Sequence, residues 1–432
     1  MNAKIIYKNT DIKKFISSIV SQNKSLNIRV EREVEKIFKN IQNKGDSALF
    51  NYAKKFDNCK LNTKNISVNK SKIKAFAKKC PKDIAKALHF SASRIKKFHI
   101  LQVPKDYKYK DNKGVVLGSK WKPINSIGIY VPGGTACYPS SILMNSIPAK
   151  IAGVKRMAMV TPQKDLELNP IIAKAAEIAE IDLIYRVGGA HSIAALAWGT
   201  RSVESVDKIV GPGNIYVTIA KKKIFGDVGI DMIAGPSEIL VVSDKNNNPS
   251  WIAADLLSQA EHDVNSRSVL LTDDLSFAKK VIKSIDLILK ELPRSQIASK
   301  SWKNNGKIII VKNILNSYQI INQLAPEHLE LAIKEPEKVL KNVYNAGSVF
   351  LGRYSPEAIG DYVAGPNHVL PTGRTARFSS GLGVTDFLKK ITFTKCNKKS
   401  LQLLSNSAIK IAKAEGLEAH ALSINMRKKN NG

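Results

Sequence analysis

The chain has 432 residues, of which 44% are hydrophobic and 24% charged, so we expect a folded protein with buried cores and more than one domain. Lys and Arg (68) outnumber Asp and Glu (36), and the resulting net charge of +32 would suit a polyanionic partner. The lysines are spread along the whole chain instead of forming one basic stripe, so we expect no specific nucleic-acid partner.

The four cysteines are far apart and form no CxxC pair, which indicates neither a disulfide framework nor a cysteine zinc site. The N-terminal segment MNAKIIYKNT lacks the apolar core of a secretory signal, and no run of about 18 apolar residues is present for a membrane span. We therefore expect a cytoplasmic protein that is not bound to a membrane.

Strand-like and helix-like segments alternate along most of the chain. Near the N-terminus, Val30, Val34, Ile37 and Ile41 are spaced as one helical face. Strands are predicted at 126–134, 156–162, 183–189, 237–244, 268–272, 307–311 and 347–352, with helices at 171–181, 249–261 and 277–292. This alternation predicts an α/β fold with parallel sheets covered by helices on both faces. The last fifty residues show no clear strand and predict a helical tail.

Polar residues are concentrated in five short runs: IAGPSE (233–238), LLSQAEHD (256–263), LAPEHLEL (324–331), GDYVAGPNHVLPTG (360–373) and EGLEAHA (415–421). Ligands bind open α/β sheets beyond the carboxyl ends of the strands, and we expect these runs to lie there. Four of the seven histidines fall within them. Gln259 and His262 are three residues apart and share one helix face, where they could form half of a zinc site. Helix caps and salt bridges would explain these residues about as well.

Signals for a nucleotide cofactor are weaker. GPGNIY (211–216) and GLGVTD (381–386) each lack the third glycine of a dinucleotide fingerprint, and neither a Walker lysine motif nor HExxH is present. VPGGTACYPSS (131–141) is a glycine turn at the end of a predicted strand, where a helix N-terminus could receive a phosphate. A plain tight turn is an equally good interpretation.

Seven runs closely resemble histidinol dehydrogenases, in the order and spacing of that family: IYVPGGTACYPSSILMN, VGPGNIYV, DMIAGPSE, LLSQAEHD, LAPEHLEL, GDYVAGPNHVLPTGRTARFSSGLGVTDF and EGLEAHA. The resemblance covers essentially the whole chain. It implies two intertwined, incomplete Rossmann-like domains with parallel sheets, plus short N- and C-terminal helical tails. The implied segments are an N-terminal tail (1–25), a discontinuous first domain (26–130 with 239–381), an inserted second domain (131–238) and a C-terminal dimerisation tail (382–432).

The same resemblance implies the four-electron oxidation of L-histidinol to L-histidine through L-histidinal, the last steps of histidine biosynthesis, with NAD and one zinc ion per subunit. The implied zinc ligands are Gln259, His262, Asp361 and His420, the last from the partner subunit of a homodimer. His328 would take the proton of the alcohol and later of the hydrated aldehyde, while Glu327 would activate the water.

The implied substrate contacts are Ser237, Gln259, His262, His328, Asp361, His368, Glu415 and His420, with Glu415 also from the partner subunit. The implied NAD contacts are Tyr130, His191 and Asn214. His191 stands where the family usually has the glutamine of a GGAQ run, so we expect the affinity for NAD or its pH dependence to differ. Cys137 is interpreted as a small turn residue and not as a thiolate nucleophile.

Two other functions remain open at this point. His262-Asp263 could begin a metal phosphohydrolase, although such folds are all-helical and the predicted strand at 268–272 argues against one. A non-catalytic nucleic-acid-binding protein would explain the charge of +32 but would leave the histidine-containing runs without a role.

Overall fold

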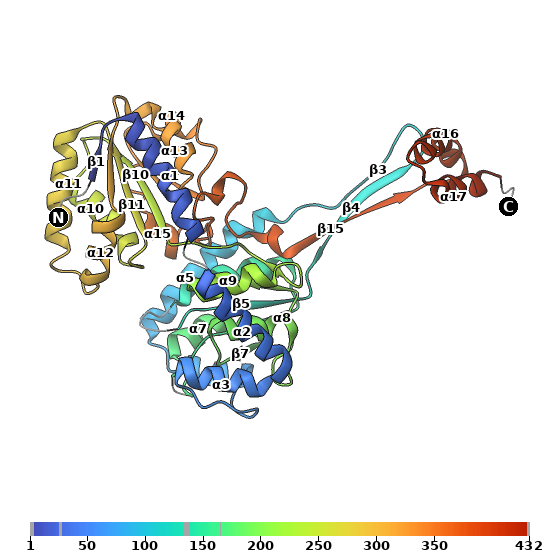
Figure 1. Ribbon diagram of the computed structural model, residues 1–432, viewed down its shortest axis with the longest axis horizontal. Coiled ribbons are helices and arrows are strands. Elements are labelled where there is room, and N and C mark those ends of the chain that lie inside the picture. Colours follow the sequence, from blue (N-terminus) through green and yellow to red (C-terminus); the bar gives the residue numbers. More distant parts are fainter. Residues whose placement is uncertain (1–3, 26–27, 134–137, 165, 430–432) are drawn as a thin grey trace.

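The structure is a computed structural model that describes residues 4–25, 28–133, 138–164 and 166–429. Two six-stranded sheets form its body (Figure 1). Sheet 1 has the order β1 (Lys4–Ile6), β12 (Lys307–Ile310), β11 (Arg267–Thr272), β10 (Glu238–Ser243), β13 (His328–Ala332) and β14 (Ser348–Leu351), and all its strand pairs are parallel. This arrangement confirms the predicted α/β class with parallel sheets.

Sheet 2 has the order β2 (Ser67–Asn69), β7 (Leu183–Tyr185), β6 (Arg156–Val160), β5 (Ser126–Tyr130), β8 (Lys208–Val210) and β9 (Gly229–Ile230). Its pairs are parallel except for the antiparallel edge pair of β2 with β7. The strands β5 and β10 are buried along their whole length. Such continuous burial is expected of parallel strands covered on both faces.

Helices cover both faces of each sheet. One face of sheet 1 packs against α10 (Pro249–Ala260), α11 (Leu275–Ile288) and α12 (Ser295–Asn305), and the other against α1 (Asn9–Ser25), α13 (Tyr318–Leu324) and α14 (Pro336–Leu340). One face of sheet 2 packs against α2 (Ile28–Lys44), α3 (Asp46–Asp57), α8 (Gly189–Trp198) and α9 (Ile215–Ile224), and the other against α4 (Lys70–Ala77), α5 (Lys82–His99), α6 (Pro139–Ala152) and α7 (Pro170–Ile178). Among the described helices, none is long and apolar enough to cross a membrane.

The strands do not divide between the sheets as the predicted segments implied. β1 lies in the expected N-terminal tail but is an edge strand of sheet 1, and β2 and β5 lie in the segment 26–130 but belong to sheet 2. β5 pairs with both β6 and β8, so the second unit begins well before residue 131. An apolar run predicts a buried strand, but it does not reveal which sheet the strand joins.

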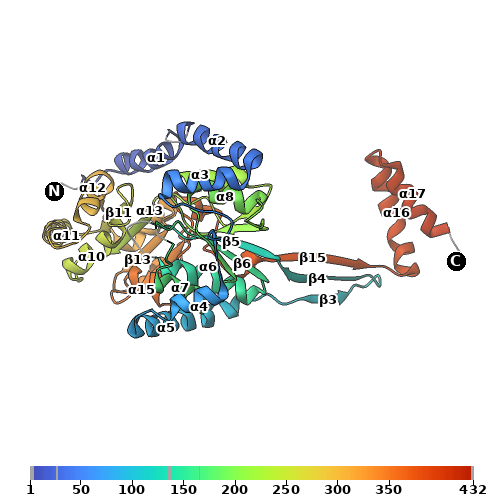
Figure 2. The same ribbon diagram turned by 90° about the horizontal axis from the view of Figure 1, so that it is seen from below.

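An arm projects from the body (Figures 1 and 2). It consists of an antiparallel ribbon, β15 (Leu388–Lys395), β4 (Val116–Pro123) and β3 (Tyr107–Lys110), with α16 (Lys398–Ala414) and α17 (Glu418–Lys429) at its far end. The prediction of no strand in the last fifty residues was wrong, because β15 lies there. Most of β15 is exposed, so its sequence LKKITFTK carries no buried face that could be recognised.

Candidate active site

The polar residues of sheet 1 gather at the amino ends of its strands. Glu327 and His328 stand at the start of β13, Ser237 and Glu238 at the start of β10, and Gln259 in the last turn of α10, which leads into β11. The prediction that these runs lie beyond the carboxyl ends of the strands was therefore wrong. The runs 233–238, 256–263 and 324–331 precede β10, β11 and β13. The sequence pattern alone does not distinguish the loop before a strand from the loop after it.

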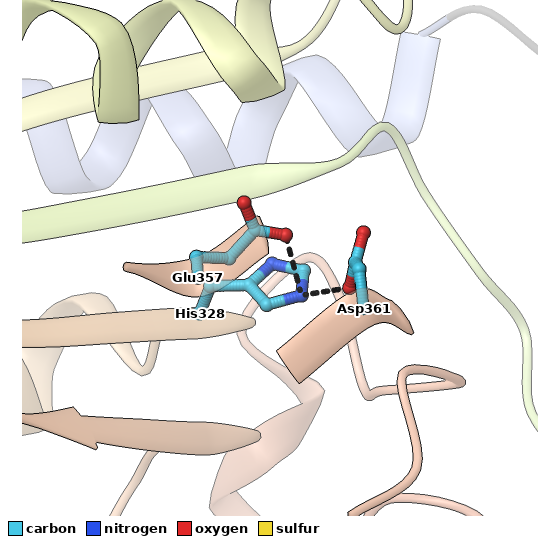
Figure 3. Close-up of side chains that lie close together, drawn as sticks. All are labelled: His328, Glu357 and Asp361. Carbon is cyan, nitrogen blue, oxygen red and sulfur yellow. Dashed lines mark ion pairs between the residues drawn. The ribbon is translucent and has the colours of Figure 1, made fainter. Parts of the chain in front are cut away.

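Residue Glu238 orients both members of the Glu327–His328 pair through its main chain. Its N–H donates to Glu327 Oε2 at 2.8 Å, and its carbonyl oxygen lies 3.1 Å from His328 Nδ1. A carbonyl oxygen only accepts, so Nδ1 carries the hydrogen and donates it. In the neutral ring the other nitrogen, Nε2, carries the lone pair, and it lies 3.7 Å from both Glu357 Oε1 and Asp361 Oδ1 (Figure 3).

Burial and charge strongly shift the pKa values of this group. Burial lowers the pKa of His328, but the carboxylates of Glu327, Asp361 and Glu357 outweigh it and raise the pKa to about 10. Burial raises the pKa of Glu327 to about 8, although His328 opposes the shift, and it raises that of Glu357 to about 7. The pKa of Asp361 is depressed, because the nearby rings of His328 and His368 outweigh the opposing effect of its burial. The site therefore strongly favours a positive charge.

Several buried polar atoms at this site have no hydrogen-bond partner among the described residues: both amide atoms of Gln259, His328 Nε2 and Glu357 Oε1. Such atoms are costly to bury without a partner and are suited to binding a ligand. Ligand atoms of His328, Glu357 and Asp361 all lie within 4.8 Å of one another. The 3.7 Å separations are too long for hydrogen bonds, so the two carboxylates lie beside His328 Nε2 without being bonded to it.

Three of the predicted zinc ligands lie near one another. His262 is close enough to Asp361 for that carboxylate to raise its pKa, against the larger lowering caused by burial. Gln259 is close enough to Glu357 to lower the pKa of that carboxyl, which burial raises. The fourth predicted ligand, His420, is exposed on α17 at the far end of the arm, and Glu415 is exposed at the end of α16 (Figure 1).

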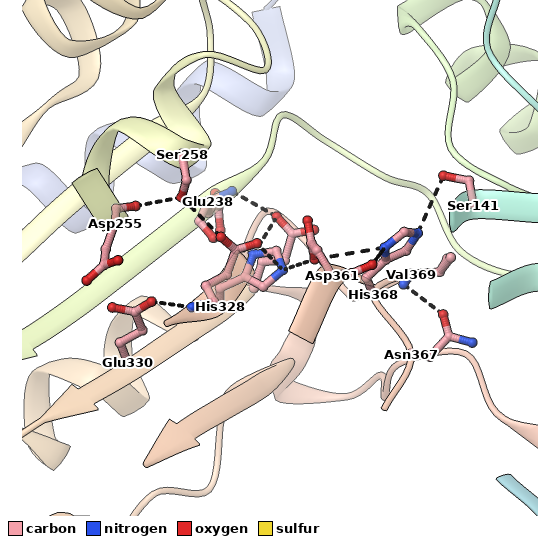
Figure 4. A network of polar contacts seen from close by, with 12 residues as sticks. Ser141, Glu238, Asp255, Ser258, His328, Glu330, Asp361, Asn367, His368 and Val369 are labelled. Atoms are coloured by element: carbon pink, nitrogen blue, oxygen red, sulfur yellow. Dashed lines mark hydrogen bonds and ion pairs between the residues drawn. The ribbon is translucent and has the colours of Figure 1, made fainter. Parts of the chain in front are cut away.

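Glu357 was not predicted, and the carboxylates of Glu330 and Asp255, labelled in Figure 4, belong to the same group. Ser258 Oγ donates to Glu357 Oε2 at 3.1 Å, and the Glu357 N–H donates to Glu330 Oε1. Burial raises the pKa of Asp255 to about 6, and burial together with Asp255 raises that of Glu330 well above its ordinary value. One signal for Glu357 was available: it lies four residues before Asp361 on α15 (Glu357–Tyr362), which places both on one helix face.

His368 lies at the edge of the same group. Its Nδ1 is 2.9 Å from the carbonyl oxygen of Asp361, and its ring lines a small cavity together with His328, Phe350 and Asp361. Ser237, the other predicted substrate contact on this side, is half-buried, and its carbonyl oxygen accepts from the N–H of Arg267 at 2.9 Å.

Two of the predicted NAD contacts lie close together at the carboxyl edge of sheet 2. Tyr130 ends β5, and its hydroxyl accepts from the N–H of Gly189 at 3.2 Å. Burial raises the pKa of Tyr130 to about 12, which keeps this hydroxyl protonated. His191 follows in the first turn of α8, where Nε2 lies 3.6 Å from Asp57 Oδ2 and neither ring nitrogen has a hydrogen-bond partner among the described residues. These unpartnered atoms fit a ligand that forms hydrogen bonds.

The third predicted NAD contact, Asn214, is exposed and caps α9. Its side-chain oxygen accepts from the N–H groups of Tyr216 and Val217. The side-chain NH₂ group is not used in this cap and can donate to a ligand. The predicted phosphate turn 131–141 is described only in part, because residues 134–137, including Cys137, lie outside the described ranges.

Comparison with known proteins extends over nearly the whole chain. The family model described as "Histidinol dehydrogenase" matches residues 20–428. Histidinol dehydrogenase 1 of Nostoc sp. is 49% identical over 426 residues, 98% of each chain, and histidinol dehydrogenase of Brucella abortus (strain 2308) is 49% identical over 417 residues, 96% of this chain and 97% of that one. The crystal structure of histidinol dehydrogenase from Elizabethkingia anophelis superposes with a TM-score of 0.92 at 38% identity, covering 99% of this chain and 98% of that one. The chain belongs to the histidinol dehydrogenase family.

Proposed function

We propose that this protein converts L-histidinol through L-histidinal to L-histidine in the cytoplasm, with NAD as electron acceptor and one zinc ion per subunit. Membership of the family makes the chain an oxidoreductase of histidine biosynthesis that oxidises histidinol. It also removes the grounds for a phosphohydrolase or a nucleic-acid-binding protein. The finer assignments below rest on the geometry of the site.

The observation that carries the proposal is the buried pair Glu327–His328, held by the main chain of Glu238. Because His328 Nδ1 donates to the Glu238 carbonyl, Nε2 of the neutral ring is the nitrogen that can accept a proton from the alcohol and later from the hydrated aldehyde. Glu327 Oε2 is fixed by the N–H of Glu238, and its raised pKa makes it a stronger base than a surface carboxylate. We propose that Glu327 takes a proton from the water molecule that hydrates the aldehyde.

The donor set fits zinc. Gln259, His262 and Asp361 offer an amide oxygen, an imidazole nitrogen and a carboxylate oxygen, which are zinc ligand types, and the amide of Gln259 is buried without a partner. When bound, zinc would supply the positive charge that this site favours and would polarise the alcohol. In our proposal His420 of the partner subunit is the remaining ligand.

We also assign to the partner subunit the contact between Glu415 and the substrate ammonium group. Both Glu415 and His420 are exposed at the far end of the arm in the single chain, which supports a role toward a second copy (Figure 2). Ser237 and His368 complete the proposed substrate contacts within one chain. NAD would accept hydride beside Tyr130, His191 and Asn214, at the carboxyl edge of sheet 2.

The test is the amount of NADH formed per L-histidinol consumed at completion, measured by absorbance with and without a chelator. We expect two NADH per substrate, abolished by the chelator and restored by zinc. One NADH per substrate would mean that the aldehyde escapes, and the role assigned to Glu327 would then be wrong. Formation of no NADH would contradict the proposed reaction.

A further inference from the structure

Two polar contacts join helix α6, which packs against sheet 2, to the metal-site loop, residues 363–369 after α15. Figure 4 shows one of them, between Ser141 and His368. Asn367 Nδ2 donates to the carbonyl oxygen of Met144 at 2.7 Å, and Ser141 Oγ lies 3.4 Å from His368 Nε2. The loop leaves α15, which carries Asp361, whereas α6 follows the strand that ends in Tyr130. These contacts therefore connect the part of the molecule with the metal donors to the part with the predicted cofactor contacts.

The His368 ring forms two hydrogen bonds, and the carbonyl oxygen of Asp361 determines which group donates in each. The carbonyl oxygen of Asp361 can only accept, so His368 Nδ1, at 2.9 Å, is the donor. In the neutral ring Nε2 then has only a lone pair, and the Ser141 hydroxyl is the group that donates to it. A continuous chain results, from the Ser141 hydroxyl through the His368 ring to the main chain of Asp361.

The hydroxyl of Ser141 is not needed to hold its own backbone. Asn145 Nδ2 donates to the Ser141 carbonyl oxygen at 2.7 Å, and Asn367 ties the loop to α6 through Met144. Ser141 lies in the first turn of α6 and is buried, with 4% of its surface exposed. Replacing its hydroxyl with hydrogen should leave both segments in place and change only the restraint on the His368 ring.

We propose that Ser141 is a positioning residue for the oxidation: its hydroxyl fixes the His368 ring, and through it the substrate, with respect to the cofactor. This inference rests on the proposed function, in which His368 contacts the substrate. Hydride transfer requires the substrate carbon and the cofactor to be held close together, and here the two are held by different sheets. The Ser141–His368 contact joins those two sheets at the substrate.

The test compares Ser141→Ala with the matched control Ser146→Ala. Ser146 is buried five residues further along α6, and its hydroxyl donates within the helix, to the Ile142 carbonyl oxygen at 2.7 Å. Loss of one hydrogen bond predicts that Ser141→Ala raises the KM for L-histidinol roughly five-fold, with the KM for NAD unchanged. Ser146→Ala should leave both KM values unchanged. Equal effects of the two variants on KM and melting temperature would overturn the proposal.

A double-mutant cycle with His368→Gln separates positioning from a general structural effect. If Ser141 acts through His368, Ser141→Ala should change the KM for L-histidinol little in the His368→Gln background. An undiminished effect there would overturn the inference.

A spectroscopic readout does not depend on turnover. The ¹⁵N resonance of His368 Nε2, assigned with His368→Gln, should move in Ser141→Ala toward the position of a ring nitrogen without a hydrogen bond. An unchanged resonance would overturn the inference even if the wild type proved inactive on L-histidinol. Inactivity of the wild type would count against the proposed function alone.

Discussion

The main chain of Glu238 holds the two side chains to which we assign the proton transfers of the proposed site. Its N–H and carbonyl bind Glu327 and His328, which are adjacent in the sequence but differ in chemistry. The side chain of Glu238 is in turn held by Arg267, its register partner on β11. The pairing of strands therefore fixes the His328 nitrogen to which we assign the role of proton acceptor.

We predict that Glu327→Gln retains the first oxidation better than the second. The glutamine oxygen can still accept from the N–H of Glu238, so the fold should persist, but the amide cannot take a proton from water. The yield of NADH per L-histidinol should fall from about two toward about one as aldehyde accumulates, because the hydration step is lost. Separate assays with L-histidinol and with L-histidinal measure the two steps, and an equal loss in both would contradict the role assigned to Glu327.

Asp255 should make stability depend on pH. Burial raises its pKa from the ordinary value of 3.8 to about 6, so the folded state binds more protons than the unfolded state between these values. Stability then falls as the pH rises through this window, because the folded state must ionise a partly buried carboxyl. Asp255→Asn should therefore stabilise the protein by about 1 kcal/mol at pH 8, a value reduced for partial exposure, and the gain should disappear near pH 4.

Thermal unfolding of wild type and Asp255→Asn at a series of pH values measures this effect. Asp273→Asn, in the exposed turn after β11, serves as the control and should show a difference that does not grow with pH. A gain for Asp255→Asn that is the same at pH 4 and pH 8 would rule out ionisation of Asp255 as its cause.

At the scale of elements, the strands that could be predicted are those that contain an apolar run. β5, β6, β7, β10, β11, β12 and β14 all fall within or overlap the predicted strands. β13 was missed because its sequence HLELA carries His328 and Glu330, although every residue is buried. These polar residues are buried among the groups of the site, so the chemistry of the site obscures the signal of the strand.

The candidate site was predictable to a similar extent. The polar runs containing Gln259, His262, Glu327 and Asp361 could be recognised in the sequence, and the structure brings them together. The approach of Glu330 and Asp255 to Glu357 could not be predicted, because it depends on how α10 and α15 pack against β13. Sequence spacing also does not show that these runs lie at the amino edge of sheet 1.

The turn between β8 and α9 depends on a buried ion pair. Lys221 on α9 pairs with Asp231 and donates to the Gly211 carbonyl oxygen at 2.9 Å, while Asp231 Oδ2 accepts from the Gly211 N–H at 2.8 Å. Both charged side chains are almost fully buried. Lys221→Met leaves the carboxylate buried without its partner and should lower the free energy of unfolding by about 3–5 kcal/mol.

Chemical denaturation measures this loss, with Lys222→Met as a control on the same helix. Lys222 is more than half exposed and pairs with Glu31 at 3.5 Å, so its replacement should cost less than about 1 kcal/mol. Similar losses for the two variants would show that the buried pair is not what stabilises this turn.

At the scale of the whole molecule, the arm is the feature whose role is not explained by one copy of the chain, because it projects away from the body (Figures 1 and 2). Its terminal helices and the turn between them expose the apolar side chains of Leu403, Ile411, Leu417, Leu422 and Met426. The same segment carries the predicted site residues Glu415 and His420. An exposed apolar surface of this kind marks a contact with another molecule. Together these features support the proposed homodimer, in which each arm completes the site of the other subunit.

Hybrid dimers test this exchange. A hybrid that pairs a His328→Gln subunit with a His420→Ala subunit, isolated through two different affinity tags, should have about one half of the wild-type activity, because one of its two sites is intact. That site combines His328 of one subunit with His420 of the other. The reciprocal hybrid, wild type with a subunit carrying both substitutions, should be inactive, because the intact body then receives a defective arm. If His420 served its own chain, the first hybrid would be inactive and the second half-active, and the proposed exchange of arms would be wrong.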